Sequence, residues 1–390
     1  MKKSYLMIAA AAALFAACSS NDTFKDVDTQ EVQIGFEGFT ENVTKAAITS
    51  VNDLKGSGVG FTVFGYKSSE SASAWATMES TPLFNNVDVT WSSSGTGSWT
   101  YSPLRFWDKN AYYKFYAAAP STGSYSINVA TVTSGDDYSQ TATLGNKKFG
   151  FITINNAASS ISTSSADYLI DRDGAYAIGS DFTGSTATRQ AVQLDFHHVM
   201  AKIVFALKTT ISEGTITVKS LSMSGWDQNT GTFVQNSTST PDQLQHTEWT
   251  LATTQNTKGS INLVGSGTGN ASDIALTNTD AAPTVLNDWY IMVPQTITYT
   301  APAQNVTEAG LTFTVTYDYS HVEGQTTYTE SFTNQVAIVP SNQVWGTDSY
   351  TKYTLDIKPA EIKFDVTSIC DFHGFQTNES DPNPQPVDVN

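Results

Sequence analysis

The chain has 390 residues, a length that predicts two domains because one hydrophobic core seldom serves so many residues. Charged residues make up only 15% and aromatic residues 12% of it. This composition suits β-sandwiches with polar, turn-rich surfaces and argues against helical bundles and extensive disorder. The formal net charge of −17 repels phosphate backbones, so we expect no nucleic acid among its partners.

The first residues predict export. Two lysines precede the apolar run Leu6–Ala17, which is too short to cross a bilayer about 30 Å thick. The run ends in small residues before Cys18, a pattern that looks like a lipobox, where the cysteine receives diacylglycerol. We therefore expect a signal peptide over residues 1–17, lipidation of Cys18 and a polar tether over residues 18–30. Ordinary cleavage beside an incidental cysteine is the alternative.

The N-terminal domain is expected over residues 31–190. Its first strand is predicted by Val32, Ile34 and Phe36, which alternate with polar or small residues. Further short strands, separated by turns rich in serine and glycine, are predicted at residues 61–66, 87–91, 99–101, 111–117, 141–144 and 149–154.

The C-terminal domain is expected over residues 191–375, followed by a polar tail over residues 376–390. The apolar run Val192–Leu207 opens it, and its alternation favours strand over helix. Many short strands joined by turns predict sandwiches or barrels rather than helical folds. The later strands are predicted at residues 216–223, 289–293, 311–317, 328–338, 353–357 and 362–366.

No constellation of residues predicts catalysis, a metal site or a cofactor. His197 and His198 are adjacent on a predicted strand, so they point to opposite faces and cannot chelate together. Cys370 has no partner for a disulfide once Cys18 is lipidated, and we expect it to be a small core residue. A hydrolase is a third-ranked alternative that needs two carboxylates facing each other across a cleft.

The alternative function is that of a surface lipoprotein that binds glycans, and it would depend on exposed tryptophan residues. Trp226 and Trp249 are the candidate platform for stacking on sugar rings, and Trp226 lies beside a predicted turn, which leaves its exposure or burial open. Trp289 lies in an apolar strand and is expected in the core.

Four motifs in the same order resemble the fimbrillin-like family. The resemblance covers roughly residues 30–370. The motifs are Trp99-Thr100-Tyr101-Ser102-Pro103-Leu104-Arg105-Phe106-Trp107 with Tyr113–Ala117 after it, Leu194–Phe205, Tyr290–Gln295 and Trp345–Ile357.

The resemblance implies a structural protein without enzymatic activity or cofactor. Members are pilin subunits of type V pili, exported as outer-membrane lipoproteins and built of two β-sandwich domains (transthyretin-like/Greek-key). It implies that a surface protease removes the first strand, which here contains Val32, Ile34 and Phe36. A strand from another pilin subunit then fills the vacated site, and the resulting fimbria supports adhesion.

The resemblance also implies the position of the cut. Lys45 is the only basic residue between Lys25 and Lys55, so cleavage is expected between Lys45 and Ala46. The family commonly has arginine at this site, so lysine leaves open whether the protease is trypsin-like or Arg/Lys-specific. The alternative is that Lys45 is a solvated loop residue.

The donor strand is expected at the end of the second domain. Ile362, Phe364 and Val366 share one face of the last predicted strand. A stalk subunit donates such a strand, a tip subunit accepts without donating, and an anchor subunit stays lipidated and uncut; the sequence leaves these three roles open.

Overall fold

The fold comes from a computed structural model. The residues that it describes are 33–39, 51–56, 58–68, 82–95, 97–108, 112–132, 136–137, 142–143, 147–156, 167–171, 175–178, 191–227, 231–234, 249–251, 258–278, 282–359 and 361–369. Within them the chain is almost entirely β-strand, and the one helix, α1 (Val51–Leu54), has a single turn. No helix in this part of the chain is long and apolar enough to cross a membrane.

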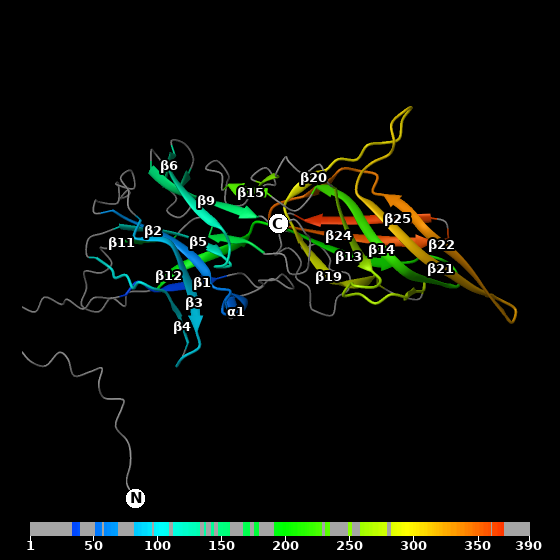
Figure 1. Ribbon diagram of the computed structural model, residues 1–390, viewed down its shortest axis with the longest axis horizontal. Helices are drawn as coiled ribbons and strands as arrows, with labels where there is room; N and C mark the ends of the chain where they lie inside the picture. The colour runs from blue at the N-terminus through cyan, green and yellow to red at the C-terminus, as the bar shows by residue number, and fades with distance from the viewer. Residues whose placement is uncertain are drawn as a thin grey trace, which may run out of the picture.

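The first sheet occupies the N-terminal half and has the order β1-β12-β10-β5-β2-β3-β4, with β11 also paired to β5 (Figure 1). All of its pairs are antiparallel except β1 with β12, which is parallel. The strands are β1 (Phe36–Phe39), β2 (Phe61–Ser68), β3 (Phe84–Ser92), β4 (Ser98–Thr100), β5 (Tyr112–Ala119), β10 (Leu169–Asp171), β11 (Ala175–Ile178) and β12 (Val192–His198).

A smaller sheet covers one face of the first sheet. Phe64 and Tyr116 of the first sheet pack with Ile152, Ile154 and Phe233 of the smaller one. The first sheet is therefore buried on both faces, which explains why its central strand β5 is apolar without clear alternation. The smaller sheet has the order β16-β15-β9-β6, with β6 (Tyr125–Val132), β9 (Lys147–Asn156), β15 (Gly231–Val234) and β16 (Trp249–Leu251), and β7 (Asp136–Asp137) pairs with β8 (Ala142–Thr143) nearby in the sequence.

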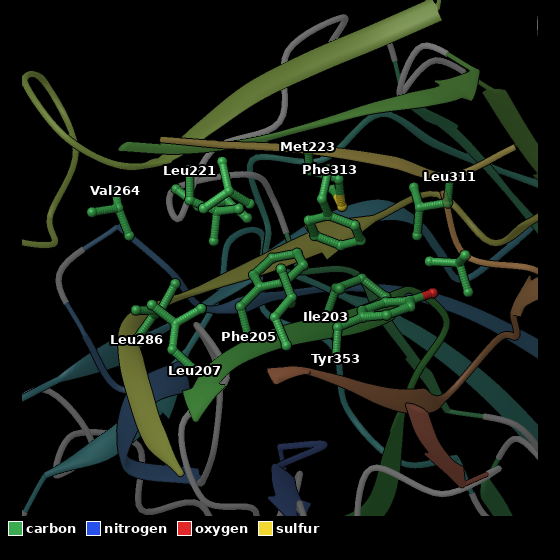
Figure 2. Packing of buried hydrophobic residues seen from close by; sticks show 14 of the residues in the cluster. Ile203, Phe205, Leu207, Leu221, Met223, Val264, Leu286, Leu311, Phe313 and Tyr353 are labelled. Atoms are coloured by element: carbon green, nitrogen blue, oxygen red, sulfur yellow. The ribbon is translucent and has the colours of Figure 1, made fainter. Parts of the chain in front are cut away.

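The C-terminal half is a sandwich of two sheets, with the orders β19-β13-β24-β25 and β17-β14-β21-β22. In Figure 2, Phe205 and Tyr353 of one sheet face Met223 and Phe313 of the other, and all four are buried. The strands are β13 (Ala201–Lys208), β14 (Thr215–Asp227), β17 (Lys258–Val264), β18 (Ile274–Leu276) on β14, β19 (Thr284–Met292), β20 (Gln295–Ile297) with β23 (Gln343–Trp345), β21 (Thr312–Glu323), β22 (Thr326–Ile338), β24 (Ser349–Lys358) and β25 (Glu361–Ile369).

The all-β fold class is confirmed, and every strand run expected from the sequence contains or overlaps an observed strand. The run Val192–Leu207 is strand, as expected, but it divides between two bodies. β12 belongs to the first sheet and β13 to the C-terminal sandwich. The chain thus crosses between them at residues 199–200, later than the expected division at residues 190 and 191. β15 and β16 follow this crossing in the sequence but belong to the smaller sheet of the N-terminal half, where β15 pairs with β9 and β16 pairs with β15.

Candidate functional site

β1 lies at the edge of the first sheet and is held there by few backbone contacts. It runs parallel to β12 in a register that places Phe36 opposite Val192 and Gly38 opposite Leu194. Just before β1, the Ile34 amide donates to the Arg105 carbonyl over 2.9 Å. One parallel ladder and a short bridge at one end therefore carry the main-chain attachment of this strand.

The inward side chains of this segment fill an aromatic pocket. Ile34 and Phe36 are 0% and 4% exposed, so their burial contributes roughly 2 kcal/mol each. The Phe36 ring is surrounded edge-on, with ring-centre distances of 5.3 to 6.4 Å, by the rings of Phe61, Phe84, Tyr101 and Phe115. We call these four rings, together with the free edge that β12 would show without β1, the β1 site.

Tyr101 ties this segment to the rest of the site. Its hydroxyl donates to the Ile34 carbonyl over 2.7 Å and accepts from the Arg105 amide at 3.3 Å. Burial raises the pKa of Tyr101 above its ordinary value, so the hydroxyl remains a protonated donor at physiological pH.

The outward side of β1 is polar. Glu37 is exposed and accepts a hydrogen bond from the Gln193 side-chain amide on β12 over 3.0 Å. At Gly35, an added Cβ atom would meet Ala191 at an ordinary contact distance of 3.5 Å. A strand in the β1 site therefore needs apolar side chains of matching shape on its inner face, whereas its outer face can carry various polar side chains.

The other expected residues of maturation lie outside the described part of the chain. These are Cys18, Val32, Lys45 and Ala46, and Cys370 falls outside it as well. Lipidation and cleavage remain predictions.

β25, the expected donor strand, lies at an edge of the C-terminal sandwich and pairs with β24 alone among the described strands. Ile362 and Phe364 pack against the core but are only partly buried, and the Phe364 ring centre lies 5.4 Å from that of Phe313. Val366 is 36% exposed. Ile362 and Phe364 thus face the core, whereas Val366, two residues further along, is exposed, and β25 is less deeply buried than β1.

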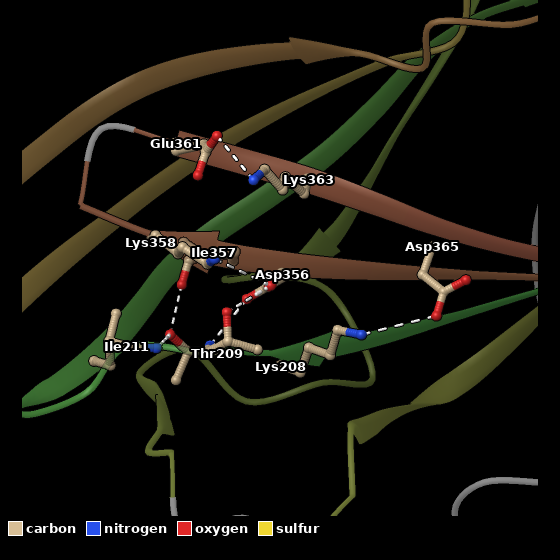
Figure 3. A network of polar contacts seen from close by, with 10 residues as sticks. Lys208, Thr209, Ile211, Asp356, Ile357, Lys358, Glu361, Lys363 and Asp365 are labelled. Atoms are coloured by element: carbon tan, nitrogen blue, oxygen red, sulfur yellow. Dashed lines mark hydrogen bonds and ion pairs between the residues drawn. The ribbon is translucent and has the colours of Figure 1, made fainter.

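A groove of about 500 Å³ runs along the open side of β25. Ile362 and Phe364 line it from β25, Ala337 and Ile338 line it from the edge strand β22, and Tyr317 contributes from β21. Glu361 and Lys363 also line the groove and lie 3.3 Å apart, and Asp365 lies 3.8 Å from Lys208 (Figure 3). Exposed ion pairs of this kind contribute little, so burial and the β24 ladder hold β25 in place.

The paired histidines behave as expected. His198 is buried and lies 2.9 Å from Asp167, whereas His197 is partly exposed and lies 3.1 Å from Asp195. They point to opposite faces of β12, so they do not form a joint site. Among the described residues, no group of three or more histidine, cysteine or acidic side chains could hold a metal ion.

The expected sugar platform is wrong, because both of its tryptophans are buried. Trp226 is 1% exposed: β14 continues through it to Asp227, and Gly259 opposite leaves room for the indole ring. Trp249 is 6% exposed, and its indole N–H donates to the Val199 carbonyl over 2.6 Å. The predicted turn beside Trp226 was a misleading signal of exposure. Of Trp289, only the main chain is described, in β19.

The residues that surround Phe36 were not predicted from the sequence. Phe84 opens β3, and Tyr101 lies within the first family motif without any sign of its hydrogen bond to Ile34. A density of aromatic residues around 99–115 was the available signal, but pairing over such sequence separations cannot be read from periodicity.

The chain is similar in sequence and in fold to known fimbrial proteins. The chain is 30% identical to the fimbrium subunit Fim1C of Phocaeicola vulgatus over 221 residues, which are 55% of this chain and 54% of that protein. The match thus spans about half the length of this curated relative. The fold is similar to that of a fimbrial protein from Bacteroides vulgatus, with a TM-score of 0.54 at 18% identity, over 86% of this chain and 98% of that one.

A model of the fimbrillin-like family matches residues 44–370, which include most of both halves described above. The chain belongs to the fimbrillin-like family.

Proposed function

We propose that this chain is a pilin subunit of a cell-surface fimbria that assembles by exchange of β1 for a strand of a neighbouring subunit. The observation that carries the proposal is β1 itself. Its side chains fill a deep aromatic pocket, yet its backbone is attached through one parallel ladder at a sheet edge. Removing it would expose unpaired amides and an apolar trough, which is a site for strand addition.

The proposed pathway has three steps. The subunit is exported as a lipoprotein anchored in the outer membrane through Cys18. A trypsin-like or Arg/Lys-specific surface protease then cuts between Lys45 and Ala46, and β1 leaves with the N-terminal fragment. The vacated β1 site takes up a strand from another pilin subunit, for which β25, with Ile362, Phe364 and Val366, is the candidate. Repetition of this step builds a polymer that supports adhesion.

Limited trypsin digestion of the purified, unlipidated protein tests the proposal, with N-terminal sequencing and electron microscopy as readouts. We expect a new N-terminus at Ala46, loss of the fragment that carries β1, and polymers afterwards. The Lys45→Gln variant keeps Lys25 and Lys55 and should remain uncut at this site and monomeric. Loss of β1 without any polymer, in the presence of intact β25, would contradict assembly by strand exchange between copies of this chain.

A further inference from the structure

β1 and β25 carry the same short pattern. The segment Gln33-Ile34-Gly35-Phe36-Glu37 places isoleucine and phenylalanine two residues apart, with a carboxylate after the phenylalanine. Glu361-Ile362-Lys363-Phe364-Asp365 repeats that arrangement.

The two segments also present this pattern in the same way. In each, isoleucine and phenylalanine point into a core, while the residues before, between and after them point outward or are exposed. The match therefore concerns side chains that would meet the same partners if one strand replaced the other.

The two segments differ at three positions, none of which is buried in the segment that contains β1. Glu361 would stand where Gln33 stands, at an exposed position. Lys363 would stand where Gly35 stands, and a Cβ atom there would meet Ala191 at 3.5 Å. Asp365 would stand where Glu37 stands, beside the Gln193 amide that now donates to Glu37. None of the three positions is buried, and a Cβ at position 35 would meet no atom closer than an ordinary contact.

The apolar side chains of β25 would be more deeply buried in the β1 site of a neighbouring subunit than they are beside β24. Ile34 and Phe36 are 0% and 4% exposed in the β1 site, whereas Ile362 and Phe364 are only partly buried beside β24. Their open side faces the groove between β22 and β25. The β1 site therefore offers these two side chains a more enclosed environment than the one they occupy in their own subunit.

On the basis of the proposed function, we infer that β25 enters the β1 site of a neighbouring subunit in the register and direction of β1. Phe364 takes the pocket of Phe36, Ile362 takes the place of Ile34, and Asp365 lies opposite Gln193. The strand runs parallel to β12, as β1 does.

Disulfide trapping tests the register. Each unlipidated chain carries Cys18→Ser and Cys370→Ser, together with Gln193→Cys and one further cysteine in β25. Three such proteins are compared, with Lys363→Cys, Asp365→Cys or Thr367→Cys. Each is cut with trypsin, inspected by electron microscopy, oxidised and run on a non-reducing gel.

Only the Asp365→Cys protein should form a ladder of disulfide-linked subunits. Directly opposite residues on neighbouring strands lie within disulfide reach, whereas a shift of two residues separates their Cα atoms by about 8 Å. Polymers that cross-link through residue 363 or 367, or through none of the three, would overturn the inferred register while leaving strand exchange intact. Failure of the trypsin-cut parent protein to polymerise would overturn the proposed function, and the register with it.

Discussion

Phe36 and Phe84 meet edge to face, with ring centres 5.3 Å apart and planes at 82°, although four strands separate β1 from β3 in the order of the sheet. The first sheet is thus curled, so that its edge strand packs against strands near the opposite end. Ile34 completes this closure through its bond to Arg105, in the segment that follows β4. β1 therefore serves as both an edge strand and a plug for the curled core.

Substitution of Phe36 should destabilise the uncut protein strongly. Phe36→Ala removes a buried ring that four aromatic rings enclose, and we expect a loss of about 3–5 kcal/mol in the free energy of unfolding. Urea denaturation followed by tryptophan fluorescence measures the change. Glu37→Ala on the same strand is the control, with an expected cost below about 0.5 kcal/mol. Equal effects of the two variants would contradict the plug role of β1.

Removal of the Tyr101 hydroxyl should loosen β1 without changing the shape of the pocket. Tyr101→Phe leaves the Ile34 carbonyl and the Arg105 amide without this partner, at a cost of about 1–3 kcal/mol. After trypsin cleavage, the fragment that carries β1 should dissociate about tenfold faster, as measured by size-exclusion chromatography over time. Tyr328→Phe, in an exposed part of β22, should release the fragment at the parent rate. An unchanged rate in Tyr101→Phe would show that the hydroxyl does not retain the strand.

Stability should fall at alkaline pH because of buried tyrosines. Burial raises the pKa of Tyr350 to about 12 from 10.0, so the folded state holds this proton where the unfolded state has lost it. The contribution is fully present below pH 10 and is lost as pH rises from 10 to 12, by an amount on the order of 2 kcal/mol. Urea midpoints should therefore be level from pH 7 to 9 and fall above pH 10. The fall should be smaller in Tyr350→Phe; an identical pH profile would rule out Tyr350 as a source.

The periodicity of the sequence was sufficient to predict the strands but not to predict which strands pair with each other. Alternation at Ile34 and Phe36 predicted one buried face, and the structure bears this out for both residues. The parallel pairing of β1 with β12 joins segments about 156 positions apart in the sequence, as in the pair Glu37 and Gln193, and no local pattern specifies such a contact.

The split of the run Val192–Leu207 was also hidden from the sequence. Val199 and Met200 lie between β12 and β13 and are themselves buried, so no polar turn marks the crossing from one sheet to the other. Trp226 shows the reverse case: a turn signal stands next to it, yet the ring is enclosed because Gly259 provides the space. Both departures arise from tertiary packing, which overrides local turn chemistry.

Phe364 should be needed for donation and not for acceptance. Phe364→Ala removes the ring that we place in the Phe36 pocket. Polymerisation of the cut variant alone should therefore slow at least tenfold. Its own β1 site is unchanged, so mixing it with cut wild-type protein should let it accept a strand but not pass one on. Polymers in an equal mixture should therefore be shorter than those of the wild type at the same wild-type concentration.

The control for this experiment is Val322→Ala, which removes an exposed side chain from β21, away from both strands of the exchange. It should polymerise at the wild-type rate and should not shorten polymers in the mixture. Uncut Phe364→Ala should have no effect in the mixture either, because β1 still fills its acceptor site. If cut Phe364→Ala polymerises as fast as the wild type, the phenylalanine of β25 does not enter the pocket, and some other segment is the donor.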